Sequence, residues 1–98
     1  MNNDKELTKV YEEIAQQKPH YGDIETGTYI KFIPTEPLTK TSVWRVHSKE
    51  DPIALGIIKW FARWRKYCFF PITDTVYEQV CLREIADFIE RKTKEHKS

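Results

Sequence analysis

The chain is predicted to be an α+β domain: a four-stranded antiparallel meander with a C-terminal amphipathic helix packed on one face, preceded by a short N-terminal helix. Three observations predict this. Apolar residues alternate with a period of two between residues 28 and 70, and the spacing becomes helical after Pro71. The connections between the candidate strands are short, which favours antiparallel neighbours. Finally, 98 residues suffice for only one hydrophobic core.

The chain divides at residue 26 into an N-terminal segment and the domain proper. We assign residues 1–26 to a helix with a linker and residues 27–98 to a single β-β-β-β-α domain. Asp4 is placed to cap the helix and Pro19 ends it. Its thin apolar stripe has helical spacing and consists of Leu7, Val10, Tyr11 and Ile14. Residues 20–27 are expected to form a linker.

Four strands are predicted at residues 29–33, 42–47, 54–60 and 64–70. Pro34 stops the first and Pro71 closes the fourth, because proline cannot donate to a sheet ladder. The third and fourth strands are separated by Phe61, Ala62 and Arg63 only. A connection this short forces an antiparallel hairpin.

A helix follows the strands. Thr75 and Glu78 have the spacing of a capping box, and a start one turn later, near Val80, is the alternative. The helix has one apolar stripe, formed by Cys81, Leu82, Ile85, Ala86, Phe88 and Ile89. We expect Ile85, Phe88 and Ile89 to pack on Trp44, Ile58 and Trp60.

Strand parity divides the sheet into two faces. The face predicted to lie under the helix holds Ile30, Phe32, Trp44, Val46, Gly56, Ile58, Trp60, Trp64, Cys68 and Phe70, and is apolar except for Lys66 near the turn. The opposite face interleaves cations with aromatic residues and holds Tyr29, Lys31, Ile33, Val43, Arg45, His47, Ile57, Lys59, Arg65, Tyr67 and Phe69. We expect this second face to stay open, or to be covered by the N-terminal helix or by a partner chain.

Several classes of function are not favoured by the composition. No apolar run approaches the roughly 20 residues of a membrane helix, and the first six residues lack the order of a signal peptide, so we expect a cytoplasmic protein. Cys68 and Cys81 are expected to be buried free thiols. The three histidines are scattered and no glycine-rich phosphate loop is present. We therefore expect no enzymatic activity, no metal and no cofactor.

The charge is unevenly distributed along the chain. Residues 27–71 carry eight Lys or Arg against three Asp or Glu, a net charge of +5, whereas residues 1–26 carry −3 and residues 72–98 carry −1. All three tryptophans and four of the five phenylalanines lie in the basic middle. Cations that follow phosphates, together with flat rings on which bases stack, are typical of proteins that bind single-stranded nucleic acid.

The leading hypothesis is therefore single-stranded DNA or RNA binding on the second face, with a homodimer as the expected assembly. The predicted nucleic-acid-binding residues are Tyr29, Lys31, Arg45, Lys59, Phe61, Arg63, Arg65, Lys66, Tyr67 and Phe69. A plainer interpretation is that these cations only keep an exposed face solvated. A third is a protein-protein interaction module acting on a host protein, since Trp, Tyr and Arg also dominate protein interfaces.

Three segments carry a resemblance to known proteins. They are Leu-Gly-Ile-Ile-Lys-Trp at 55–60, Trp-Arg-Lys-Tyr-Cys-Phe-Phe-Pro at 64–71 and Cys-Leu-Arg-Glu-Ile-Ala-Asp-Phe-Ile-Glu at 81–90. This half of the chain resembles small uncharacterised proteins of phages and prophage regions, which implies no activity. The order of strands and helix is also similar to the single-stranded-DNA-binding transcriptional coactivator and Whirly fold. That resemblance, in architecture alone, implies a dimer that holds a single strand on curved sheets.

Overall fold

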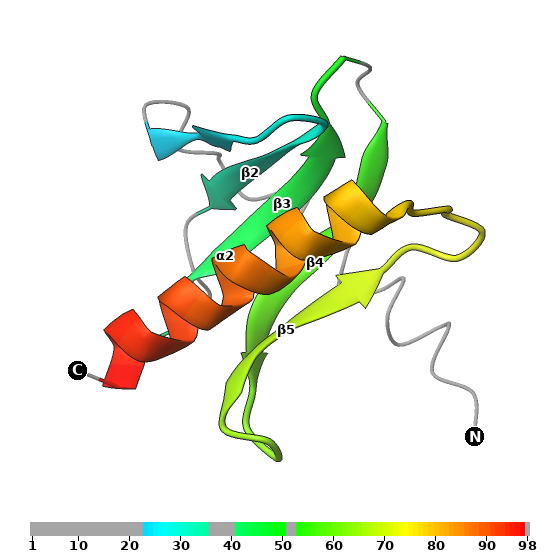
Figure 1. Ribbon diagram of the computed structural model, residues 1–98. Helices are drawn as coiled ribbons and strands as arrows, with labels where there is room; N and C mark the ends of the chain where they lie inside the picture. The colour runs from blue at the N-terminus through cyan, green and yellow to red at the C-terminus, as the bar shows by residue number, and fades with distance from the viewer. Residues whose placement is uncertain (1–22, 36–40, 51–52, 98) are drawn as a thin grey trace.

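The sheet is a meander in which every strand pairs with the next one along the chain (Figure 1). The computed structural model describes residues 23–35, 41–50 and 53–97. Within these residues the elements are β1 (Glu25–Thr26), β2 (Ile30–Thr35), β3 (Val43–Ser48), β4 (Ala54–Phe61), β5 (Lys66–Pro71) and α2 (Gln79–Lys97). All neighbouring pairs are antiparallel. The predicted α+β class is confirmed, whereas the predicted N-terminal helix falls outside the described residues.

The strand β1 was not predicted, because it is stabilised by contacts with the distant helix α2 and not by a local sequence pattern. Residues 20–27 were predicted as a linker, yet Glu25 and Thr26 pair with β2. The Glu25 carboxylate lies 2.9 Å from the Arg91 guanidinium and 3.2 Å from the Lys92 ammonium, both on α2. The Glu84 carboxylate, also on α2, accepts from the backbone N–H of Thr28 at 2.6 Å. A two-residue strand held by side chains some 60 positions away leaves no local pattern.

The prediction that a proline ends β2 was wrong. Pro34 was predicted to stop the strand, but β2 continues through it to Thr35, and Pro34 pairs with Trp44. β1 covers β2 only at Lys31 and Phe32, so Pro34 lies where that side of the strand has no ladder partner among the described residues. Proline is tolerated at such an edge.

The helix α2 begins with a glutamate cap. The carboxylate of Glu78 accepts a hydrogen bond from the backbone N–H of Cys81 at 2.7 Å. This bond lowers the pKa of Glu78. The predicted capping box starting at Thr75 does not form, since the Thr75 hydroxyl donates to the carbonyl oxygen of Ile72 instead. The later start, near Val80, is the one observed.

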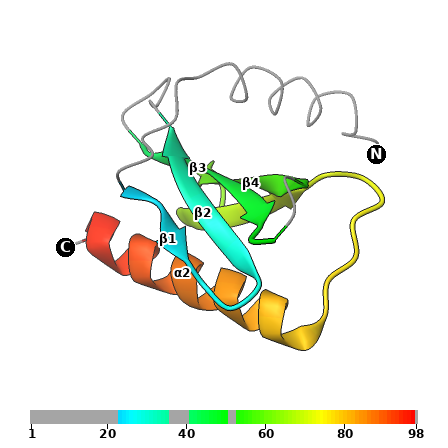
Figure 2. The same cartoon turned by 90° about the horizontal axis from the view of Figure 1, so that it is seen from above.

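The hydrophobic core lies between α2 and one face of the sheet. Figure 2 shows from above that α2 runs along that face. Phe88 is fully buried, stacks on Phe32 with ring centroids 4.1 Å apart, and meets Trp44 edge-on at 5.0 Å. The buried core residues are Ile30, Phe32, Val46, Ile58, Tyr67, Ile85 and Phe88. Trp44, Trp60 and Ile89 pack against this cluster. The predicted packing of α2 on the sheet is therefore confirmed.

The hairpin between β4 and β5 differs from the prediction by one residue, with large consequences. Phe61 pairs with Lys66, so the loop consists of the four residues 62–65, not the predicted three. The backbone N–H groups of Trp64 and Arg65 both donate to the carbonyl oxygen of Phe61, and Arg65 has a φ of 56°. Trp60 therefore pairs with Tyr67 and not with Trp64, a register shift of three residues. Because side chains alternate between faces, any odd shift moves every side chain of β5 to the other face.

The predicted faces of β5 are therefore wrong. Tyr67 pairs with Trp60 and Phe69 with Ile58, which places both under α2. Tyr67 is only 4% exposed; its backbone N–H donates to the Thr93 hydroxyl, and its own hydroxyl accepts from the Ser42 N–H. Cys68 and Phe70, predicted to lie in the core, are on the opposite face, and so is Lys66, which was predicted on the face under the helix.

Candidate nucleic-acid interface

The sheet face turned away from α2 combines an apolar centre with basic surroundings. We call it the second face; by strand parity it holds Lys31, Ile33, Thr35, Val43, Arg45, His47, Ile57, Lys59, Phe61, Lys66, Cys68 and Phe70. Ile33, Val43 and Ile57 are at most 7% exposed. The cationic side chains around them are half-buried, apart from the exposed Lys66.

No acidic residue occurs in β2, β3, β4, β5 or the hairpin loop 62–65. These segments carry six cations, namely Lys31, Arg45, Lys59, Arg63, Arg65 and Lys66. The ion pairs within the described residues all involve α2: they join Arg91, Lys92 and Lys94 to glutamates of β1 and of α2 itself. None of the six cations takes part in an ion pair with another described residue.

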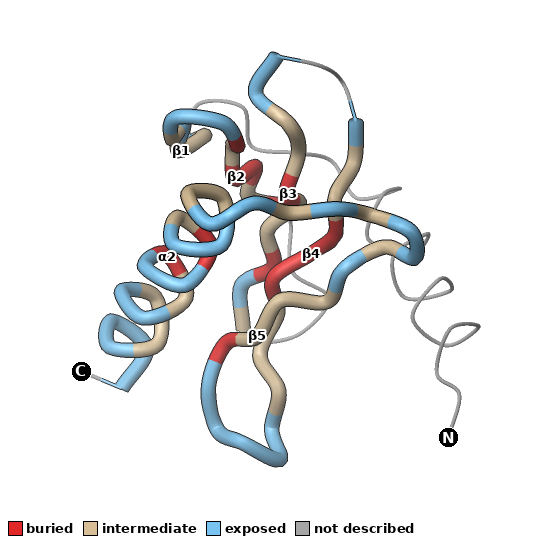
Figure 3. Tube along the Cα trace, turned by 45° about the vertical axis from the view of Figure 1, so that its right-hand side comes forward, coloured by how far each residue is buried: buried red, intermediate tan, exposed pale blue. Residues whose placement is uncertain are grey.

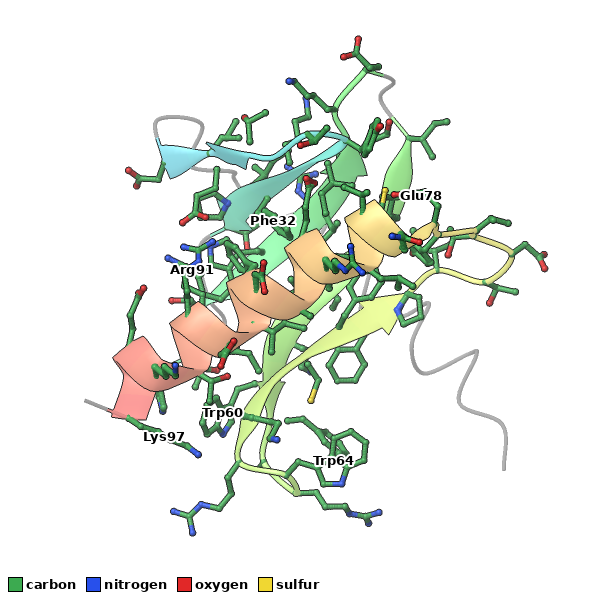
Figure 4. All side chains as sticks on the ribbon, in the orientation of Figure 1. Phe32, Trp60, Trp64, Glu78, Arg91 and Lys97 are labelled. Carbon is green, nitrogen blue, oxygen red and sulfur yellow. The ribbon has the colours of Figure 1, made fainter. Side chains whose placement is uncertain are left out.

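The hairpin tip, residues 61–66, joins aromatic rings to these cations. Trp64 is 63% exposed and meets Phe61 edge-on with centroids 4.9 Å apart. The ring centroids of Phe61 and Phe70 are 6.1 Å apart, and the Lys59 ammonium lies 5.6 Å from the centroid of the Phe70 ring. Figure 3 shows that the tip is exposed, and Figure 4 shows Trp64 at this end of the molecule.

The structure brings together most of the predicted binding residues, but not all. Seven lie on the second face or at the hairpin tip: Lys31, Arg45, Lys59, Phe61, Arg63, Arg65 and Lys66. Tyr67 and Phe69 face α2, so Tyr67 offers no free ring to a base. Tyr29 is half-exposed but lies in the turn before β2, away from the hairpin tip. The aromatic rings at the second face and the hairpin tip are Phe61, which was predicted, together with Trp64 and Phe70.

Trp64 and Phe70 were missed because parity had placed them in the core. The available signal was the length of the hairpin loop: with four residues, the alternation gives the observed faces. His47 was placed on the second face but given no role. Burial lowers its pKa, and the positive charges of Arg45 and Lys31 lower it further. Burial likewise raises the pKa of the Cys68 thiol.

A groove of about 670 Å³ lies at the N-terminal end of α2, opposite the hairpin tip. It is lined by Tyr29, Ile30, Ser48, Glu50, Ile53, Leu55, Asp74, Thr75, Val76, Tyr77, Glu78 and Cys81. Ile53 is 53% exposed and Val76 is 91% exposed. The lining includes three acidic residues and no Lys or Arg. The two ends of the sheet therefore differ in charge: one is acidic and apolar, the other basic and aromatic.

Comparison with known proteins identifies the family. Over 76 residues the chain is 32% identical to an uncharacterised 9.3 kDa protein of Acholeplasma phage L2, a match that covers 76% of this chain and 97% of the phage protein. The chain belongs to the family of this phage protein. The resemblance to small phage proteins is thereby confirmed, and the phage family brings no known activity with it.

No protein-family model and no solved structure matches this member of the phage family. The resemblance to the coactivator and Whirly architecture therefore has no support. In the part of the chain that the structure describes, no helix is long and apolar enough to cross a membrane. The same residues contain no group of three or more His, Cys, Asp or Glu side chains arranged to hold a metal ion.

Proposed function

We propose that this protein is a non-enzymatic protein that binds single-stranded DNA or RNA. The hairpin tip and the cations of the second face contact the nucleic acid. The observation that carries this proposal is the charge segregation: six cations without one carboxylate across four strands and a loop, next to three aromatic rings. Phosphates pair with the cations, and bases stack on exposed rings.

The arrangement of the cations suits an extended strand. Arg45 pairs with Ile33 on one side and with Ile57 on the other. Lys31 lies two residues from Ile33 and Lys59 two residues from Ile57, in opposite directions along the sheet. The three cations thus form a diagonal row across three strands, with Cα atoms about 8 Å apart from one to the next. The row leads toward the hairpin tip, where the rings lie.

The test is fluorescence anisotropy with labelled single-stranded DNA and RNA oligonucleotides at several salt concentrations. Each phosphate contact contributes about −0.7 to the slope of log affinity against log salt, so four to six contacts give a slope of about −3 to −4. Arg65→Gln is expected to flatten the slope by somewhat less than one unit. Arg83→Gln, which removes the same charge from an exposed site on α2, is the matched control and should leave the slope unchanged.

Stacking is tested separately from charge. Trp64→Ala is expected to weaken binding by about 1–3 kcal/mol without altering the salt slope. Leu82→Ala removes a similarly exposed apolar side chain from α2 and should leave affinity unchanged. If neither oligonucleotide binds at low salt, the proposal is wrong. The predicted homodimer stays a prediction, which sedimentation equilibrium with and without oligonucleotide tests directly.

The acidic groove favours a second candidate function, binding of a host protein. Three acidic residues border exposed apolar side chains there, so the complementary partner is a segment with a large apolar residue flanked by Lys or Arg. A peptide array with a central Trp or Leu, flanked by either Lys/Arg or Glu, provides the probe. Preference for basic flanks, lost in Val76→Lys, supports this function, whereas equal binding to both sets contradicts it.

A further inference from the structure

Two buried nitrogen atoms on the second face have no hydrogen-bond partner among the residues that the structure describes. They are Nε of Arg45 and Nε2 of His47. An unsatisfied buried polar group costs about 1–3 kcal/mol, and buried polar groups in folded proteins are nearly always paired. Two such atoms on one strand therefore require an explanation.

Both side chains share the second face with Lys31. His47 and Lys31 are directly paired across β2 and β3, so their Cα atoms are about 4.5–5.5 Å apart. Arg45 is two residues from His47 on the same strand, about 7 Å along it. Three groups that carry or accept positive charge thus occupy one patch, bordered by strands without any carboxylate.

A solvated face does not account for this patch. Water would satisfy the nitrogens of Arg45 and His47 if they were exposed, but both atoms are buried. An ion pair within the described part of the chain does not account for it either, because the charged groups there that act on the His47 ring are Arg45 and Lys31, both cationic. A bound anion with several acceptor oxygens would satisfy both donors and offset the mutual repulsion of the three groups.

We propose that Lys31, Arg45 and His47 form a binding site for an oxyanion of the phosphate or sulfate type. The Arg45 guanidinium and His47 Nε2–H donate hydrogen bonds to its oxygens, and the Lys31 ammonium supplies charge. In the proposed function, on which this assignment rests for its ligand, the site holds one backbone phosphate of the single strand. A free phosphate ion presents the same chemistry, and the experiment separates these two sources.

Anion binding at this site is linked to protonation of His47. A neighbouring negative charge favours the imidazolium and raises its pKa by about one unit or more. Affinity for the anion therefore increases as the pH falls, by a factor of about ten for each unit of that shift. Sulfate is the appropriate probe for this effect because it keeps its charge between pH 5 and pH 8.

The experiment is an NMR titration of the protein with sulfate, following the imidazole resonances of His47 at pH values from 8 to 5. We expect sulfate to shift these resonances, to raise the pKa of His47, and to bind about tenfold more tightly at the acidic end. His47→Gln should abolish the pH dependence and Arg45→Gln should abolish the site. Arg83→Gln, which removes the same charge from an exposed site on α2, is the matched control and should preserve sulfate binding.

Backbone spectra and thermal melts of each variant show whether it is folded. If Arg45→Gln does not fold, the pH dependence of sulfate binding by His47→Gln tests the site. A second arm repeats the titration with a short oligothymidylate. If the oligonucleotide binds while sulfate leaves the His47 ring and its pKa unchanged, the oxyanion site is wrong and the proposed function stands. If sulfate binds as expected and no oligonucleotide does, the site stands for a free ion and the proposed function is wrong.

Discussion

The two faces of the sheet are built from the same strands but from different chemistry. Under α2, aromatic rings lock together: Phe88 lies between Phe32 and Trp44, and Tyr67 meets both Trp44 and Trp60 edge-on. On the second face the apolar cluster is small, with Val43 and Ile57 buried and Phe70 packed against them. All the cations of the strands surround that small cluster.

The difference shows how one alternating pattern serves two purposes. Rings that stack and meet edge-on contribute beyond the area they bury, so the face under the helix holds the fold together. Cations are expensive to bury without partners, so they gather on the face that α2 does not cover. Stability is therefore expected to depend mainly on one face and ligand binding on the other.

The largest expected effect tests the face under the helix. Phe88→Ala removes a fully buried ring and should lower the free energy of unfolding by about 3–5 kcal/mol, measured by urea denaturation. Leu82→Ala, on the same helix but 51% exposed, should change it by less than about 0.5 kcal/mol. A loss below about 1 kcal/mol for Phe88→Ala would mean that α2 does not pack as described.

A direct comparison of the faces comes from two adjacent isoleucines. Ile57 and Ile58 both have 0% exposure but point to opposite faces. Each substitution by Ala is expected to cost about 2–5 kcal/mol, with Ile58→Ala at the upper end because its cluster is larger. The same urea melts measure both. Equal costs, or a larger cost for Ile57→Ala, would remove the distinction between the faces.

Arg65 tests the hairpin that sets which residues of β5 lie on which face. Its φ of 56° is unfavourable for any residue with a Cβ. Arg65→Gly is therefore expected to raise the free energy of unfolding by about 0.5–1 kcal/mol, after allowing for the greater entropy of glycine in the unfolded chain.

The same substitution is expected to weaken oligonucleotide binding, because it removes a cation of the tip. Arg65→Gln separates the two effects, since it loses the charge but keeps the backbone strain. Thermal melts and anisotropy on both variants provide the measurement. Finding Arg65→Gly no more stable than Arg65→Gln would show that the hairpin does not have this geometry.

The smallest expected effect concerns the edge of the sheet under the helix. The hydrogen bond from Arg91 lowers the pKa of Glu25 below its ordinary value of 4.5. The stabilisation is therefore present above that value and is lost as the pH falls through the lowered pKa. Because both side chains are more than one-third exposed, Glu25→Gln should cost less than about 1 kcal/mol at pH 7.

Chemical denaturation between pH 7 and pH 3 measures this loss, and the variant should show a smaller decrease in stability on acidification than the natural chain. Glu90→Gln, which removes an ion pair within α2 only, is the control. An unchanged pH profile for Glu25→Gln would mean that Glu25 does not link β1 to the helix.

Much of the fold followed from local patterns. Period-two alternation placed β2, β3 and β4 to within about two residues, and the apolar stripe of α2 identified the residues that reach the core, because both signals depend only on neighbouring positions. Seven predicted site residues lie on the second face or at the hairpin tip, and six of them are cations. These were predictable because the excess of basic residues in 27–71 can be counted directly in the sequence.

The amino-acid sequence by itself determined the α+β class, the helix face and the positions of the basic residues. Only the tertiary structure decided the strand β1, which depends on Glu25 and Glu84 meeting α2, and the faces of Tyr67, Phe69 and Phe70. The local sequence is compatible with a hairpin loop of three residues and with one of four. The choice follows from which rings pack better beneath the helix, and that is a property of contacts between distant segments, which no local pattern contains.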